Sequence, residues 1–338
     1  MASPNFTFAY NVDKGILADV YLPSTPRVSE IPVVVYWHGG GKLFHAVVDS
    51  LDSYLYYRAE LCRSIVVSPS VVNYGDYKLL PPSTGHEILQ DVLDLVTWVS
   101  SSSGLNTSLH QINDKRGIDT SRIIVAGTSA GGYLAYLAAI HARLEHPLRG
   151  VLSMYGMGGN LLTPHYLWRK TKPFFRGRPL LDPAQFEAFL NTAHPPPQTN
   201  GSTLEYGPDG IPISPRMFLT RVLLQEGTFL DYLTGDHGLS EGLRALDQPT
   251  INDVPQEHRS LFPEAGLSSG FPPTCLVHGT EDTAVLIGES KALSDRLRNP
   301  NVPCQLFEVE GAEHSFDYQD GHEAVLEQVF QVLQGWLK

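Results

Sequence analysis

Short apolar runs, many of them β-branched, alternate along the chain with longer segments in which apolar residues recur every three or four positions. The short runs predict buried strands, and the longer segments predict helices with one apolar face. The expected strands are Leu17 to Leu22, Val33 to Trp37, Ile65 to Ser68, Arg122 to Ala126, Gly150 to Met154, Thr274 to His278 and Cys304 to Val309. The expected helices are Glu87 to Ser100, Ala130 to Leu144, Ile287 to Arg298 and Glu323 to Leu337. Because parallel strands need a crossover to return, this alternation predicts an α/β fold whose mostly parallel sheet has helices on both faces.

The alternation stops between residues 156 and 270, a stretch that is rich in proline and aromatic residues and has no run typical of a strand. Two helical patterns occur in it, Pro183 to Asn191 and Pro215 to Thr234. We therefore predict a core of residues 1–155 and 271–338 with an inserted helical cap at 156–270. Most of its aromatic rings are expected to pack within the cap, and a few to line a substrate pocket.

Composition narrows the possible partners and the cellular setting. With 338 residues, of which 42% are hydrophobic and 18% are charged, the chain can bury a large core. Its formal net charge of -12 opposes binding to nucleic acid and to anionic lipid. We expect no membrane span and no export signal, because the required apolar segments are missing. Three scattered cysteines, Cys62, Cys275 and Cys304, favour free thiols over a disulfide framework, so we expect a cytoplasmic protein.

Residues 127–131 read Gly-Thr-Ser-Ala-Gly, which is a G-x-S-x-G motif. An expected strand directly precedes it and an expected helix directly follows it, which places Ser129 on a sharp turn. Small flanking residues keep such a turn free of collisions, and the helix N-terminus behind the serine favours developing negative charge. We therefore predict that Ser129 is a nucleophile.

A second glycine-rich segment, His-Gly-Gly-Gly at 38–41, follows another expected strand. Backbone without side chains can approach a substrate closely, and its amides can donate to a carbonyl oxygen as negative charge develops there. We expect the amides of Gly40, Gly41 and Ala130 to form an oxyanion hole. An ordinary glycine-rich loop is the alternative interpretation, which the nearby serine motif disfavours.

Two later segments supply an acid and a base. His-Gly-Thr-Glu-Asp at 278–282 and Gly-Ala-Glu-His-Ser-Phe at 311–316 each follow an expected strand. Ser, Asp and His thus occur in the chain order that is typical of a serine triad with this kind of nucleophile turn. We expect His314 to accept the serine proton, and Asp282 to fix the imidazole tautomer and stabilise the imidazolium.

Other residues of these segments are alternatives for the same roles. Glu281 is the alternative acid and His322 the alternative base, although His322 opens a helix instead of following a strand. His278 is expected to brace the strand end. The histidines show no spacing typical of a metal site, so we expect neither a metal nor another cofactor.

With these motifs in place, the chain resembles the hormone-sensitive-lipase-like branch of the α/β-hydrolases, including fungal carboxylesterases. The segments that carry the resemblance are His-Gly-Gly-Gly at 38–41, Asp-Tyr-Lys-Leu-Leu-Pro at 76–81, Asp-Thr-Ser-Arg-Ile at 119–123, Gly-Thr-Ser-Ala-Gly at 127–131, His-Gly-Thr-Glu-Asp at 278–282 and Glu-His-Ser-Phe at 313–316. The resemblance implies an α/β-hydrolase fold and ester hydrolysis by Ser129, Asp282 and His314.

The chain departs from that branch in three places. Many relatives carry an acidic residue where Thr128 stands, and another where Pro82 stands. Their cap is usually built chiefly from N-terminal helices, whereas here the long insertion is at 156–270. A basic run from Arg169 to Arg178 lies in that insertion; it is interpreted as a solvated face or, alternatively, as a site for a substrate carboxylate or phosphate.

These observations favour a serine esterase that acts on a medium-sized, largely apolar small molecule through an acyl-enzyme. An acyltransferase, thioesterase or lactonase in a secondary-metabolite pathway uses the same triad and stays an alternative. A noncatalytic small-molecule receptor on the same fold is a third hypothesis, disfavoured because all three triad residues are present. A homodimer is a further expectation, which rests on the family likeness alone.

Overall fold

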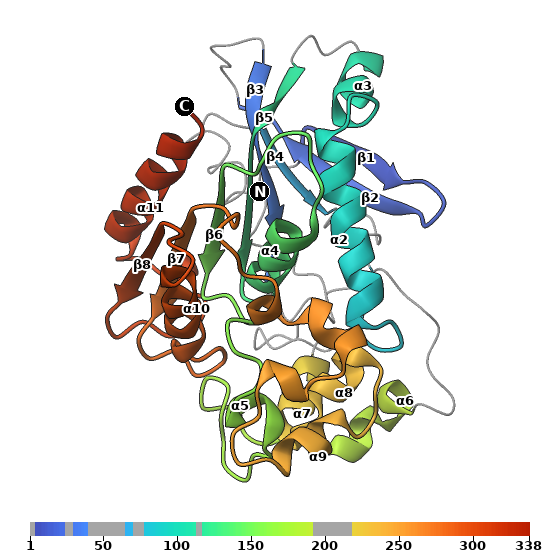
Figure 1. The fold of residues 1–338 in the computed structure, drawn as a ribbon, viewed down its shortest axis with the longest axis vertical. Coiled ribbons are helices and arrows are strands. Elements are labelled where there is room, and N and C mark those ends of the chain that lie inside the picture. The colour runs from blue at the N-terminus through green and yellow to red at the C-terminus, as the bar shows by residue number, and fades with distance from the viewer. Residues whose placement is uncertain (1–3, 24–29, 40–64, 70–77, 113–116, 192–217) are drawn as a thin grey trace.

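The computed structural model describes residues 4–23, 30–39, 65–69, 78–112, 117–191 and 218–338. The described strands form one eight-stranded sheet in the order β1-β2-β4-β3-β5-β6-β7-β8 (Figure 1). The strands are β1 (Phe6–Asn11), β2 (Ile16–Tyr21), β3 (Glu30–Trp37), β4 (Ile65–Pro69), β5 (Gly117–Thr128), β6 (Gly150–Met154), β7 (Thr274–Gly279) and β8 (Cys304–Val309). β1 and β2 run antiparallel to their neighbours, and all other pairs are parallel. The predicted α/β fold is confirmed, and β1 is a strand that the apolar pattern did not predict.

Helices flank this sheet and fill one end of the molecule. The α-helices are α2 (Gly85–Ser100), α3 (Leu105–Gln111), α4 (Ala130–His141), α5 (Pro164–Leu167), α6 (Glu187–Leu190), α7 (Leu219–Glu226), α8 (Phe229–Thr234), α9 (Leu239–Arg244), α10 (Gly288–Arg298) and α11 (Glu323–Trp336). Short 3-10 helices are η1 (Pro183–Phe186), η3 (Ile251–Asp253), η4 (Gln256–Leu261), η5 (Pro263–Ala265) and η6 (Phe316–Tyr318). α2 begins at a capping box, in which the amide of Thr84 donates to the Glu87 carboxylate over 2.9 Å.

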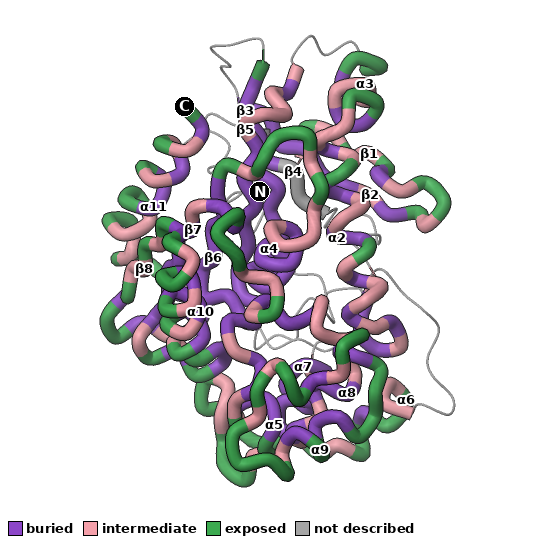
Figure 2. Tube along the Cα trace, in the orientation of Figure 1, coloured by how far each residue is buried: buried purple, intermediate pink, exposed green. Residues whose placement is uncertain are grey.

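The central strands are buried on both faces, because successive side chains point to opposite sides of the sheet. Val33 and Val35 belong to the cluster that packs under α2, α4 and α10, whereas Val34 and Tyr36 belong to the cluster under α11. Figure 2 shows the central strands and α4 almost entirely in the buried colour. This double coverage explains why the strand sequences are continuous apolar runs instead of alternating ones.

The expected elements lie within a few residues of the observed ones, with one exception. A single helix was predicted from Pro215 to Thr234, but the described part of this stretch holds two helices, α7 and α8. Gly227 separates them with a left-handed φ of 67°, and its amide donates to the Leu224 carbonyl. Apolar residues recur with helical spacing on both sides of this glycine. The pattern therefore did not predict that α7 ends there.

Residues 156–270 connect β6 to β7, and helices α5 to α9 lie together at one end of the molecule (Figure 1). Within the described part of this segment, the one strand-like pairing is an isolated bridge between Phe174 and Arg178. The hydroxyl of Tyr133 in α4 donates to the Leu261 carbonyl of η4 over 2.8 Å, which ties the segment to the core. The division into core and cap stays a prediction.

Two further observations concern the cysteines and the length of the helices. Cys275 and Cys304 are free thiols, as expected, and Cys62 lies outside the described residues. In the described part of the chain, every helix is too short or too polar to cross a bilayer.

Candidate active site

Ser129 lies on a sharp turn between β5 and α4, with φ 53° and ψ -121°. Its amide donates to the Met154 carbonyl over 3.0 Å, which anchors the turn to β6. A β-carbon on Gly127 would lie 2.2 Å from the backbone of Gly131, and one on Gly131 would lie 2.0 Å from the Trp37 carbonyl oxygen. Both glycines of the motif are therefore required by close backbone contacts. A non-glycine residue with this positive φ is strained, and such strain clusters at functional sites.

The loops after β7 and β8 bring the other two predicted residues to Ser129. Nε2 of His314 lies 3.0 Å from the Ser129 Oγ, and Nδ1 of His314 lies 2.7 Å from Asp282 Oδ2. All three residues are buried, with exposed fractions of 7%, 4% and 7% for Ser129, Asp282 and His314. This geometry lets the imidazole take the serine proton on one nitrogen while the carboxylate accepts from the other.

The Asp282 carboxylate is held by several donors. Oδ1 accepts from the amides of Ala284 and Val285, each over 2.9 Å, and Oδ2 lies 3.3 Å from Nε2 of His278. Burial alone would raise the pKa of Asp282, but hydrogen bonds from His278 and His314 outweigh it and hold that pKa well below its usual range. The Asp282 carboxylate is therefore ionised at neutral pH.

His278 does more than brace the end of β7. Its Nε2 lies 2.8 Å from the Val285 carbonyl, which can only accept, so the proton is on Nε2. Its Nδ1 lies 2.7 Å from the Ser290 hydroxyl. The Nε2 proton thus points between Val285 and Asp282, and the fully buried imidazole supports the Asp282 carboxylate.

Glu313 joins the acid loop to the base loop, a role that the sequence did not indicate. Its Oε1 accepts from the amides of Thr283 (2.8 Å) and His314 (2.7 Å), and its Oε2 accepts from the Thr283 hydroxyl (2.6 Å). The acid and base loops are therefore connected directly as well as through Asp282 and His314. The acidic residue before the histidine can be seen in the sequence. Only the fold shows that its carboxylate bridges two loops instead of facing solvent.

Tyr155 is a second residue near His314 that the sequence patterns did not indicate. Its φ of 41° is positive, and its ring meets the His314 ring edge-on at a centroid distance of 4.7 Å. Its hydroxyl donates to Asp317 Oδ1. The aromatic side chain fills the space beside the imidazole and limits its rotation.

The alternative residues do not reach the site. Glu281 is exposed, and its amide donates to the Ala312 carbonyl over 3.0 Å. His322 precedes α11, where its ring contacts Phe316 at a centroid distance of 5.2 Å. Asp282 and His314 are thus the acid and base positions that the geometry brings to Ser129.

The expected oxyanion donors are described in part. Gly40 and Gly41 lie outside the described residues. The third, Ala130, is the first residue of α4, and its amide is next to Ser129. Gly39 approaches the serine closely, since a β-carbon on it would lie 3.1 Å from the Ser129 Cβ. The segment 38–41 therefore begins beside the nucleophile, as its motif predicts.

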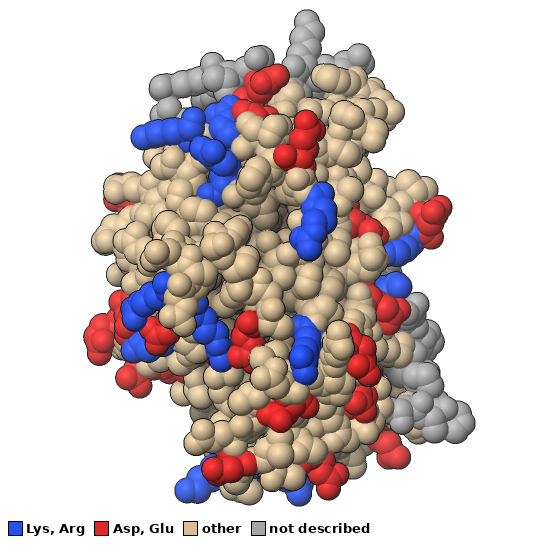
Figure 3. All heavy atoms as spheres, viewed as in Figure 1, with Lys and Arg blue, Asp and Glu red and all other residues tan. Residues whose placement is uncertain are grey.

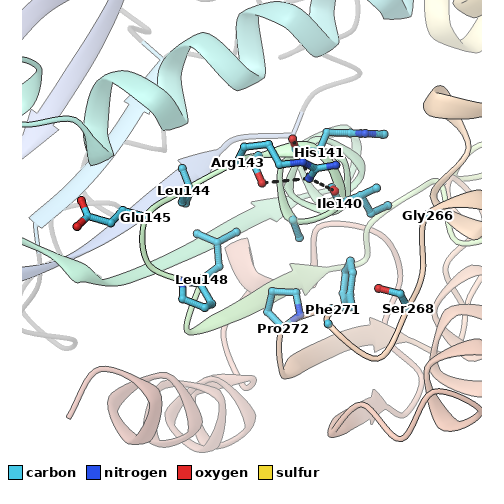
Figure 4. Close-up of a pocket in the computed structure, with 14 residues that line it drawn as sticks. Ile140, His141, Arg143, Leu144, Glu145, Leu148, Gly266, Ser268, Phe271 and Pro272 are labelled. Atoms are coloured by element: carbon cyan, nitrogen blue, oxygen red, sulfur yellow. Dashed lines mark hydrogen bonds between the residues drawn. The ribbon is translucent and has the colours of Figure 1, made fainter.

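A separate cavity of about 660 Å³ lies at the far end of α4 (Figure 4). It is formed by the residues that follow this helix, among them Arg143 and Leu148, together with Phe271 and Pro272. Arg143 caps the helix by donating to the carbonyls of Ile140, His141 and Ala142. Since Ser129 precedes α4 and the cavity lies at its C-terminal end, the cavity is separate from the triad. Among the described residues, no group of three or more metal-ligating side chains lies together.

Comparisons with known proteins agree with this geometry. A probable carboxylesterase, M8, of a Phoma species is 27% identical over 334 residues, which cover 93% of this chain and 89% of that protein. A non-reducing polyketide synthase of Emericella nidulans is 26% identical over 328 residues, but the match spans only 12% of its length. An esterase of Pyrobaculum calidifontis shares the fold with a TM-score of 0.58 and 21% identity, covering 95% of this chain and 80% of that chain. Residues 34–205 match the Abhydrolase_3 family model of the alpha/beta hydrolase fold. The chain therefore belongs to this α/β-hydrolase family, the one that its motifs resemble.

Proposed function

We propose that Ser129, His314 and Asp282 are the catalytic triad with which this carboxylesterase cleaves a carboxylic ester of a medium-sized, largely apolar molecule. The observation that carries the proposal is the chain of short contacts from Ser129 Oγ through the His314 ring to Asp282, at 3.0 and 2.7 Å. This arrangement has the nucleophile, base and orienting acid that acyl transfer requires.

The reaction has two halves. His314 takes the proton from Ser129 as the oxygen attacks the ester carbonyl, and it returns that proton to the leaving alcohol. The amides of Gly40, Gly41 and Ala130 stabilise the oxyanion. Loss of one essential donor typically raises the activation free energy by about 3 to 4 kcal/mol. Water, activated by His314, then cleaves the acyl-enzyme and regenerates the serine.

We assign the cap role to residues 156–270. This segment reaches the acid loop directly, because the amide of Arg176 donates to the Thr283 hydroxyl over 2.7 Å. Nε2 of His165 donates to the Ala284 carbonyl over 3.1 Å, and burial lowers the pKa of His165 to about 4, so it is neutral at pH 7. Contacts with the two residues that follow Asp282 support the view that the cap borders the substrate site.

An acyltransferase, thioesterase or lactonase of secondary metabolism is the second candidate. The similarity to one segment of a polyketide synthase favours it, because that enzyme contains a related unit within a much longer chain. The triad does not choose between water and another acceptor. A cytoplasmic location and a homodimer stay predictions.

The test is hydrolysis of p-nitrophenyl esters of increasing acyl length by the parent protein and by Ser129→Ala. We expect turnover in the parent, a fall of at least about a thousandfold in the variant, and labelling of the parent at Ser129 by a fluorophosphonate. Labelling without ester turnover favours the transferase or thioesterase candidate. Absence of labelling contradicts the triad assignment and favours a receptor.

A further inference from the structure

Four of the five cations in the basic run of the 156–270 segment fall into two groups. Nε of Arg169 lies 3.1 Å from the Glu226 carboxylate. Nζ of Lys170 donates to main-chain carbonyls, including those of His165 (2.6 Å) and Trp168 (2.7 Å). These two cations therefore serve the internal structure of the segment. Among the residues that the structure describes, the side chains of Arg176 and Arg178 have neither kind of partner, and these two arginines form the second group with Arg221 of α7.

The three arginines lie close together. The Arg178 amide donates to the Phe174 carbonyl over 3.1 Å, which closes a turn, and the guanidinium of Arg221 donates to the carbonyl of Pro179 directly after it. Burial lowers the pKa of Arg178, and so does the positive charge of Arg176. Burial and the charge of Arg178 lower the pKa of Arg221 in the same way. Three like charges thus repel one another across this turn.

No acidic side chain compensates them within the described part of the chain. None of the three guanidinium groups has a carboxylate within 4.0 Å among those residues. Arg221 is only 6% exposed, and its buried Nε has no hydrogen-bond partner there. On the face shown in Figure 3, Asp and Glu predominate around the helical end of the molecule. A buried cation without a counter-charge is costly, so an anionic ligand is the natural complement.

The turn that carries two of these arginines is attached to the catalytic loop. Phe175, Arg176 and Gly177 have successive left-handed φ values of 55°, 63° and 67°. Such backbone is strained at non-glycine residues and persists where the surroundings hold it, as in ligand clamps. The Arg176 amide is bound to the hydroxyl of Thr283, the residue after Asp282. The arginine group is therefore fixed next to the loop that positions the triad acid.

We propose that Arg176, Arg178 and Arg221 form an anion subsite that binds a carboxylate or phosphate of the substrate, remote from the ester bond. The planar guanidinium forks bind such oxygens in a bidentate manner, and the neighbouring positive charges attract them. This inference rests on the proposed function, since it names a substrate class for the same triad. The preferred substrate is a half-ester or a phosphorylated ester.

A matched pair of substrates tests the subsite. p-Nitrophenyl hydrogen adipate carries a terminal carboxylate, whereas p-nitrophenyl hexanoate has an acyl chain of the same length without it. We expect a lower KM for the adipate in the parent, and Arg178→Gln to raise that KM about tenfold while leaving the hexanoate unchanged. Arg178→Lys should restore part of the preference, because it restores the charge. Arg169→Gln is the matched control and should behave as the parent.

Arg176→Gln is a second variant, since the exposed side chain of Arg176 can be replaced without opening the interior. Equal KM increases for both esters would overturn the subsite, because they indicate a general structural role. Equal KM values for both esters in the parent would overturn it as well.

Calorimetric binding to the Ser129→Ala protein separates this inference from the proposed function, because it needs no turnover. Monomethyl adipate should bind more tightly than dimethyl adipate, and Arg178→Gln should remove the difference. That result supports the subsite even if no ester is hydrolysed by the parent. Equal binding of the two adipates contradicts the subsite and leaves the triad assignment untouched.

Discussion

The side chains around Ser129, Asp282 and His314 indicate how one residue can position others from the neighbouring loops. Glu313 accepts from Thr283 and from the His314 amide, so it fixes the distance between two loops that come from different strands. Small displacements of a catalytic group lower the rate strongly, because reacting atoms must approach within a narrow range. Glu313 and Thr283 are therefore expected to position His314 relative to Asp282.

Replacing Thr283 tests this positioning role. Thr283→Val removes the hydroxyl that joins Arg176 to Glu313, and we expect kcat to fall roughly tenfold with little change in KM for a neutral ester. Thr283→Ser keeps the hydroxyl and should keep most of the parent kcat. Steady-state kinetics with p-nitrophenyl hexanoate measure both. An equal loss of kcat in the Ser variant, which keeps the hydroxyl, would contradict a positioning role of that hydroxyl.

The residues that the sequence identified differ in kind from those that it missed. Ser129 and His314 stand in short motifs next to strands, and chain order singled out Asp282. Tyr155 belongs to no motif, and Glu313 stands in a motif only as the neighbour of His314, because the roles of both depend on contacts between loops that the folded sheet brings together. His278 was assigned to the end of β7 correctly, but its proximity to Asp282 depends on the bend of the following loop.

At the scale of elements, apolar periodicity predicted where most helices and strands lie but not where every one ends. The stretch expected as one helix is divided by Gly227, and a β-carbon there would lie 2.5 Å from the Leu167 carbonyl oxygen. That contact comes from α5, far away in sequence, so local pattern could not reveal it. β1 was missed because its exposed face gives it an alternating burial pattern instead of a continuous apolar run.

Glu289 of α10 connects two elements and gives the fold a pH dependence. Glu289 is 4% exposed, and its carboxylate accepts from the amide of Asn160 over 3.1 Å, which holds the segment after β6. Burial raises the pKa of Glu289 to about 7, from a usual value of 4.5. The folded protein therefore binds this proton more tightly than the unfolded chain, and the associated stability is lost as pH rises through about 7.

We expect the free energy of unfolding of the parent to fall by about 3 kcal/mol between pH 5 and pH 8 from this group, and Glu289→Gln to lose that decrease. Urea titrations at several pH values measure the difference. Glu308→Gln, which removes a carboxylate 43% exposed beside Lys291, is the matched control and should keep the parent dependence. A Glu289→Gln curve parallel to that of the parent would exclude Glu289 as the source.

At the scale of the whole molecule, the core and the 156–270 segment share one hydrophobic cluster. Ile88 of α2 and Tyr133 of α4 belong to the same cluster as Leu233 of α8 and Leu261 of η4. The start of α2 packs so closely on α8 that a β-carbon on Gly85 would lie 2.8 Å from the Leu233 side chain. The two parts are therefore expected to unfold together.

Leu233→Ala tests this cooperativity. The substitution leaves a cavity between α2 and α8, and we expect it to lower the free energy of unfolding by roughly 2 to 5 kcal/mol in a single transition. Far-UV circular dichroism and tryptophan fluorescence should report coincident unfolding curves in the parent and in the variant. Two separate transitions, of which the variant shifts only one, would show that the parts unfold independently.

The pairing of β6 with β7 has a consequence for how such a protein diversifies. Val151 lies opposite Thr274, so the two strands are direct neighbours although the whole 156–270 segment separates them in sequence. The sheet does not depend on the length of that connection, and each doubling of a flexible connection costs only about 0.6 kcal/mol. Related proteins can therefore carry a longer, shorter or different segment between β6 and β7, as long as contacts such as that between Leu233 and the start of α2 are kept. The strands that precede Ser129, Asp282 and His314 can stay unchanged while the connection between β6 and β7 varies.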